Sequence, residues 1–127
     1  MNYNPRIISA LTPIGIEVIP DFYDAKKKRV DKNGNELPDL KEWIVFNYVT
    51  ESPILHGDDE DIEEKTLIDV HHFTKDKAKA HKIKELIKKS LRYSGFTIES
   101  TMPPSYENDT GFYHTTVTIS DTDSTEV

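Results

Sequence analysis

The strongest periodic pattern in this 127-residue sequence lies between positions 76 and 94, where apolar residues recur every three or four positions. Lysine and arginine are frequent in the places between them, as expected for a helix with one buried stripe. The apolar positions are Ala80, Ile83, Ile87 and Leu91. Thr74 or Asp76 can cap the beginning of this helix, and Gly95 suits the left-handed residue that follows a helix end.

Strand patterns occur on both sides of this helix. The predicted strands cover residues 14–19, 42–50, 66–73, 96–100 and 111–120. The segment 42–50 is dense in aromatic and β-branched side chains, which pack well in a sheet. Within 66–73 the apolar residues alternate, so that Ile68 and Val70 share one face.

Near the N-terminus, Asn4-Pro5 predicts the beginning of a short helix, with Asn4 as the N-cap and Pro5 in the first helical position. Thr12-Pro13 should end this helix after about two turns, because the residue before proline avoids the α conformation.

Polar segments separate or end these elements. We expect exposed loops or excursions at 24–42 and 51–64, a proline-containing loop at 102–108, and a flexible acidic tail at 121–127. Asn33-Gly34, within the first of these, favours a hairpin turn.

Together these elements predict a single α+β domain over residues 1–120. A mostly antiparallel sheet should be covered on one face by the long helix 76–94 and the short N-terminal helix, because a helix with one apolar stripe must bury it against a sheet.

Charge is distributed unevenly along the chain, whose net charge is −7. Residues 51–64 hold seven acids and no lysine or arginine, whereas residues 76–94 hold seven bases and two acids. An acidic chain is a poor candidate for tight nucleic-acid binding, since phosphate contacts need clustered cations. Cysteine is absent, and the longest purely apolar run is residues 43–46, so we expect an intracellular protein without disulfides or membrane contact.

The histidine-rich stretch DVHHFTKDKAKAH, residues 69–81, invites a metal-site interpretation. His71 and His72 are consecutive in a predicted strand and should therefore point to opposite faces. A trio of Asp69, His71 and His114 is conceivable if their two strands are adjacent, and it would define a small metal-dependent enzyme as the alternative from another class. We interpret the stretch instead as a strand-to-helix junction.

Signatures of catalysis are missing from the sequence, which contains no GxSxG, P-loop or GxGxxG motif. A general acid requires a carboxyl group held in a dry pocket, and the acids here cluster in a segment that should be solvated. We therefore expect no enzyme activity, no catalytic residues, no metal site and no cofactor.

Several segments, in order, resemble one phage family: WIVFNYV, the loop DDE, LIDVHHFTKD, IKKSLRYSGF and YENDTGFYHTTVTIS. The family is the tail-completion or tail-terminator proteins of long-tailed phages and prophages of Gram-positive bacteria, and the resemblance covers about residues 40–120. The excursion 24–42 and the dense acidic segment 51–64 depart from the family pattern.

The resemblance implies a small α/β or α+β domain with a sheet covered by helices, and a structural role without catalysis. The protein would form a ring, expected to be a hexamer, at the top of the tail tube. It would meet the tail-tube protein and the head connector or stopper protein. DNA would pass without sequence-specific binding, and the protein would act in the virion after assembly in the host cytoplasm. Another head–tail connector component is the nearest alternative.

The charge map suggests which residues would form such a ring, because head-to-tail contacts need two different patches on each subunit. The acidic candidates are Asp58, Asp59, Glu60, Asp61, Glu63 and Glu64, and the basic candidates are Lys82, Lys84, Lys88, Lys89 and Arg92. A competing hypothesis assigns the acidic residues to the channel lining, where they would repel the DNA backbone.

Overall fold

The computed structural model describes residues 2–21, 29–55 and 61–126, with the backbone alone at 50–55, 61–64 and 122–126. In order, its elements are helix α1 (Asn4–Leu11), the 3-10 turn η1 (Thr12–Ile14), β1 (Val18–Pro20), β2 (Arg29–Val30), β3 (Glu36–Leu37), β4 (Glu42–Leu55), β5 (Asp61–Thr74), α2 (Lys77–Tyr93), β6 (Thr97–Tyr106) and β7 (Tyr113–Glu126).

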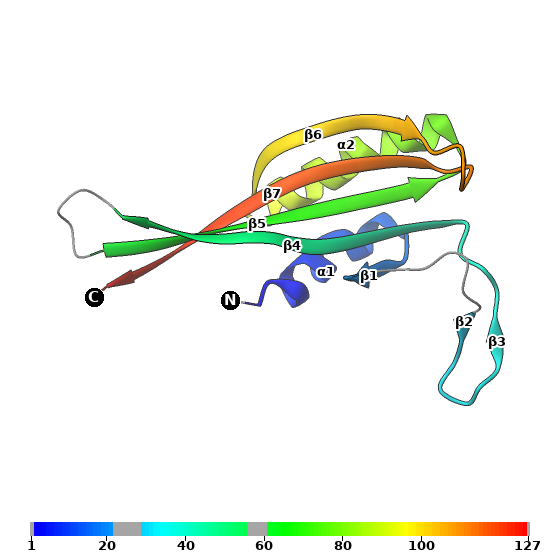
Figure 1. The fold of residues 1–127 in the computed structure, drawn as a ribbon, viewed down its shortest axis with the longest axis horizontal. Coiled ribbons are helices and arrows are strands. Elements are labelled where there is room, and N and C mark those ends of the chain that lie inside the picture. The colour runs from blue at the N-terminus through cyan, green and yellow to red at the C-terminus, as the bar shows by residue number, and fades with distance from the viewer. Residues whose placement is uncertain (1, 22–28, 56–60, 127) are drawn as a thin grey trace.

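The main sheet has five strands in the order β1-β4-β5-β7-β6, with β1 parallel to β4 and every other pair antiparallel. Both helices lie on the same side of this sheet (Figure 1). The predicted α+β class, with a mostly antiparallel sheet and one long and one short helix, is confirmed.

The main core lies between the helices and the sheet. It is formed by buried apolar residues of β4, β5 and β7 on one side and of both helices on the other. Its members include Ile7, Leu11, Ile44, Phe46, Ile68, Val70, Ile83, Ile87, Leu91, Val117 and Ile119. The predicted stripe of α2 and the shared face of Ile68 and Val70 are therefore confirmed.

A second, smaller cluster occupies the opposite face of the sheet. Trp43 stacks on Phe73 at 5.1 Å between ring centroids and meets the edge of Phe112 at 4.8 Å. Trp43 and Phe112 are buried in this cluster. The sequence pattern did not predict this cluster, because its three rings are distant along the chain.

Helix α2 ends where the sequence predicted. Asp76 caps its beginning, since its carboxylate accepts hydrogen bonds from the N–H groups of Ala78 and Lys79. At the other end Gly95 has φ +94°, and the N–H of Phe96 reaches back to the carbonyl of Leu91. Both helix signals are confirmed.

The beginning of α1 differs by one residue from the prediction, because Tyr3 is the N-cap and Asn4 is already helical. Asn4 does not cap the helix because its side-chain oxygen accepts a hydrogen bond from the hydroxyl of Tyr48, at 2.9 Å. The same hydroxyl accepts a hydrogen bond from the N–H of Tyr3, so a side chain of β4 fixes the position of the first residues of α1.

Three predicted loops or tails are largely strand. β4 continues to Leu55 and β5 begins at Asp61, so most of the expected loop 51–64 is a paired ribbon, while residues 56–60 lie outside the described chain. β7 runs through most of the expected tail, and β6 runs through most of the expected loop 102–108. Polar sequence misled the prediction because backbone pairing satisfies N–H and C=O groups whatever the side chains are.

The expected excursion at 24–42 contains the small hairpin β2–β3. Its turn has Gly34 at φ +83°, as the Asn33-Gly34 pair indicated. The carboxylate of Asp31 accepts the N–H groups of Asn33 and Asn35 across this turn. Figure 1 shows the hairpin projecting away from the main sheet.

At the other end of the molecule, the three central strands extend past both helices (Figure 1). We call this extension the arm and define it as residues 51–55 of β4, 61–66 of β5 and 121–126 of β7. Arg6 of α1 anchors its base, because its guanidinium pairs with Asp121 at 2.5 Å and donates to the carbonyl of Ser94.

Candidate functional site

The two histidines considered as metal ligands meet on the sheet face opposite the helices. His71 of β5 and His114 of β7 approach with Nδ1 and Nε2 2.8 Å apart. Nε2 of His71 also contacts the side-chain oxygen of Asn47 at 3.0 Å, and Nδ1 of His114 lies 3.3 Å from a carboxylate oxygen of Glu107. The four side chains thus form one polar chain across three strands and the β6–β7 turn.

The positions of the protons in this chain of side chains follow from the groups that each ring nitrogen contacts. The oxygen of Asn47 can only accept, so His71 donates from Nε2, and Nδ1 of the neutral His71 ring accepts from Nε2 of His114. Burial lowers the pKa of His71, the neighbouring His114 lowers it further, and Asp69 opposes both effects. His71 is therefore neutral at physiological pH, and both of its ring nitrogens are engaged.

Asp69 shares the face of His71 but does not join the pair. Its carboxylate accepts a hydrogen bond of 2.6 Å from the hydroxyl of Thr118. Within the described chain, no three histidine, aspartate or glutamate side chains are arranged to hold a metal ion. Strand adjacency brings His71 to His114, but the trio with Asp69 does not converge on one point.

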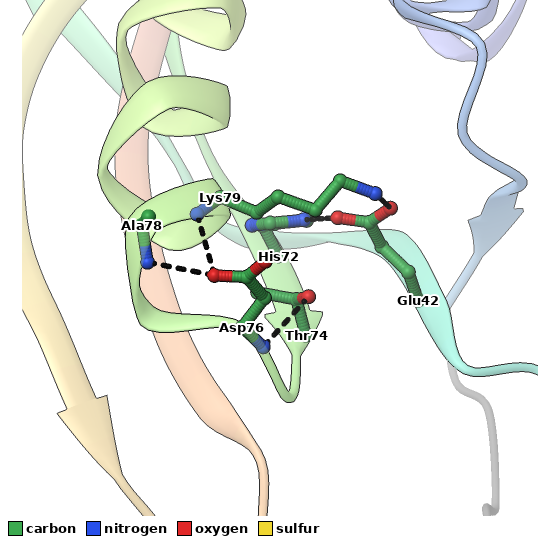
Figure 2. Close-up of polar contacts among 6 residues, drawn as sticks. All are labelled: Glu42, His72, Thr74, Asp76, Ala78 and Lys79. Carbon is green, nitrogen blue, oxygen red and sulfur yellow. Dashed lines mark hydrogen bonds and ion pairs between the residues drawn. The ribbon is translucent and has the colours of Figure 1, made fainter.

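His72 points to the other face and is completely buried beside the helix layer. Its Nε2 lies 2.9 Å from one carboxylate oxygen of Glu42, and Lys79 of α2 contacts the other oxygen at 2.9 Å (Figure 2). Figure 2 also shows Asp76 capping the helix in the same region. The predicted strand-to-helix junction is thus held by a polar cluster.

Protonation of His72 is opposed by its surroundings. Burial lowers the pKa of His72, and this effect exceeds the opposite effect of Glu42. Burial alone would raise the pKa of Glu42, but the hydrogen bonds from Lys79 and His72 hold it below its usual value. Nδ1 of His72 and the hydroxyl of its cross-strand neighbour Thr115 are buried without a hydrogen-bond partner, so the neutral ring is favoured.

Three of the acidic candidates belong to the arm: Asp61, Glu63 and Glu64 lie in β5. The predictions for Asp58, Asp59 and Glu60 fall outside the described residues. In the register of β5 and β7, Asp61 is opposite Glu126 and Glu64 is opposite Asp123. Directly opposed like charges destabilise a strand pair, so the arm should gain from a cationic neighbour.

The basic candidates all lie on α2. Lys82, Lys89 and Arg92 are exposed, while Lys84 and Lys88 are half-buried. Lys88 has Glu85 at 3.6 Å. Figure 1 shows the arm extending away from both helices, so a single subunit presents the acidic and basic groups in separate places.

A groove of about 590 Å³ lies between α1 and the last turns of α2, and sequence reasoning did not predict it. Residues of both helices line it, including Ala10, Pro13, Lys89, Ser90 and Tyr93. The side chain of Tyr93 is 93% exposed. The only sequence signal was an aromatic residue outside the apolar stripe of α2.

Comparison of the sequence with protein-family models gives no match, and comparison with curated proteins also gives none. Neither helix of the described chain has the length and apolar character needed to cross a membrane.

Proposed function

We propose that this protein is a structural component of long-tailed phage virions that ends the tail tube and joins the tail to the head. It acts as a ring of copies, expected to be six, at the head–tail junction. Its partners are further copies, the tail-tube protein and the head connector, and DNA passes through the ring without sequence-specific binding.

Support comes from the sequence resemblance over residues 40–120 and, above all, from the arm, which no helix of the described chain covers (Figure 1). A strand ribbon without a second layer gains little stability from its own packing, so an arm of this kind is typical of a segment that binds a neighbour. Pro53 lies in the arm part of β4, whose outer edge has no strand beside it in the described chain. Proline there disfavours simple edge-to-edge strand addition, so we expect contact through the surface of the ribbon.

Ring formation needs two different and complementary patches on each subunit. The acidic arm and the basic α2 meet that requirement, since they have opposite charges and separate positions on one chain. Surface ion pairs contribute about 0–1 kcal/mol each, so they set the register and the encounter rate, while apolar contacts hold the ring.

The arm could instead line the channel, where its charge would keep DNA from adhering. Electrostatic repulsion is screened over about 8–10 Å at physiological salt, so this second role requires the arm to lie close to the bore. The two roles predict different consequences of reversing the same charges.

The test is a variant in which Asp58, Asp59, Glu60 and Asp61 are all changed to lysine. Its control reverses the same number of exposed acids outside the arm: Glu17, Glu36, Asp39 and Asp109. Mass from light scattering and symmetry from electron microscopy, with and without tail tubes, report the assembly.

We expect the unaltered protein and the control variant to form rings on tail tubes, and the variant with lysine at positions 58–61 to lose them. Intact rings with slow DNA ejection would instead assign the acids to the bore. The proposal fails if the unaltered protein remains monomeric in the presence of tubes. It also fails if a phage lacking the gene joins tails to heads normally.

A further inference from the structure

Helix α2 has an exposed stripe beside its buried one. Lys82, Leu86, Lys89 and Tyr93 follow one another at helical spacing, and all four are exposed. The stripe therefore alternates lysine with large apolar side chains, and its last two members also line the groove between α1 and α2. Groove and stripe form one continuous surface, which we call the α1–α2 surface.

Tyr93 is the most exposed large hydrophobic residue in the described chain, at 93%. A nearly free aromatic ring beside an apolar groove is the kind of anchor that tyrosine provides in protein interfaces. Lys82 and Lys89 form no ion pair with any residue that the structure describes, so their charges are available to a partner.

We propose that the α1–α2 surface binds the arm of a second copy of this protein. The proposal deepens the proposed function and rests on it, because it assigns the contact that would join neighbouring subunits in the ring.

Composition favours the arm as the occupant. Its sequence combines apolar residues with acids. Leu55 and Ile62 are register partners in its outer part, and Glu64, two positions from Ile62, shares their face of the ribbon opposite Asp123. The α1–α2 surface, with Lys89 at the groove and Lys82 further along the stripe, is complementary to such a segment. Contact with lysine would also relieve the repulsion between opposed acids of β5 and β7.

Length also agrees. The stripe from Lys82 to Tyr93 spans about 17 Å at 1.5 Å per residue. The part of β7 in the arm, residues 121–126, also spans about 17 Å at 3.3 Å per residue. One arm can therefore cover the whole stripe.

The occupant must come from another subunit. Arg6 fixes the base of the arm through Asp121, and Figure 1 shows the arm leaving from there in the direction away from both helices. The arm of a chain thus points away from its own α1–α2 surface, whereas a neighbour related by rotation can present its arm to it. Such a contact is head-to-tail, and its repetition closes a ring when the rotation between neighbouring subunits divides a full turn.

Because the chain has no cysteine, site-specific disulfide cross-linking tests this contact directly. One variant has Leu55→Cys in the arm, and a second, distinguished by a tag of different mass, has Ser90→Cys in the groove. The control replaces the groove variant with Asn33→Cys, which puts an exposed thiol in the β2–β3 turn. The variants are mixed on tail tubes and oxidised.

We expect the mixture of Leu55→Cys and Ser90→Cys to give about tenfold more mixed dimer than the control, because bound thiols react at a raised effective concentration. We also expect Tyr93→Asp to abolish ring formation and Lys77→Glu, in the first turn of the same helix, to leave it intact. Far-ultraviolet circular dichroism and thermal unfolding verify that each variant folds.

Rings that form with no excess of mixed dimer, or that tolerate Tyr93→Asp in a folded protein, overturn the α1–α2 contact and leave the proposed ring function standing. If the unaltered protein forms no ring on tail tubes, the proposed function itself fails, and the α1–α2 contact fails with it.

Discussion

Nε2 of His72 lies 2.9 Å from a carboxylate oxygen of Glu42, which joins the end of β5 to the beginning of β4. Lys79 contacts the other oxygen of the same carboxylate, so the first turn of α2 is held to both strands. Burial keeps His72 neutral where strand and helix meet, because it lowers the pKa of the ring by more than Glu42 raises it. This has consequences for stability at low pH.

Acidification should destabilise the fold through its buried histidines. The pKa values of His72 and His71 are lowered from the ordinary value of 6.5, so the unfolded chain binds more protons as the pH falls below about 6.5. The free energy of unfolding should therefore decrease from that pH downwards. Urea denaturation at a series of pH values measures this decrease.

In the same series, His72→Gln should show a weaker dependence on pH between 6.5 and the acid limit of folding. His81→Gln, on the exposed side of α2, is the matched control and should keep the dependence of the unaltered protein. If the free energy of unfolding depended on pH equally in all three proteins, His72 would not be a cause of the acid sensitivity of the fold.

Loss of the helix cap should lower stability by a predictable amount. Asp76→Ala removes the acceptor for the N–H groups of Ala78 and Lys79, which should reduce the free energy of unfolding by about 1 kcal/mol. Lys77→Ala, one residue further on and exposed, should change it little. Chemical denaturation measures the free energy of unfolding of both variants. Equal values would contradict a capping role for Asp76.

Gly95 should tolerate substitution less well than a glycine with a similar backbone. An added Cβ at Gly95 would lie 2.9 Å from Nη2 of Arg6, whereas one at Gly15 would meet nothing within 4 Å. Both have positive φ, which costs about 1–2 kcal/mol for alanine. Gly95→Ala should therefore lower the free energy of unfolding more than Gly15→Ala does, because the contacts of Arg6 must also shift.

Removing Arg6 tests this explanation. In an Arg6→Ala background the difference between the two glycine variants should shrink, as a double-mutant cycle of unfolding free energies would reveal. An unchanged difference would mean that Gly95 is sensitive for a reason unrelated to Arg6.

His71 should be neutral with its proton on Nε2 at pH 7. The side-chain oxygen of Asn47 can only accept, so Nε2 of His71 must carry the proton. Nδ1 of His71 accepts a hydrogen bond from Nε2 of His114. Nitrogen-15 chemical shifts of the imidazole distinguish the two tautomers. Asn47→Ala should remove the preference, and a proton on Nδ1 in the unaltered protein would contradict the network.

Local patterns were sufficient to predict helix α2. Its apolar stripe, the Asp76 cap and the Gly95 end are determined within a few residues, because helical hydrogen bonds and caps join neighbours in sequence. The same holds for the hairpin turn at Asn33-Gly34, and for the opposite orientations of His71 and His72, which follow from the alternation of any strand.

Only the tertiary structure decided how far the strands run, and therefore that the acidic segment forms an arm. Cross-strand pairing satisfies the backbone between segments distant in sequence, which no local polarity pattern can report. The same reason explains the contact of His71 with His114, 43 residues apart, and the groove between α1 and α2. Composition determined which charges and apolar residues this protein has, while strand register and helix packing decided which of them become neighbours.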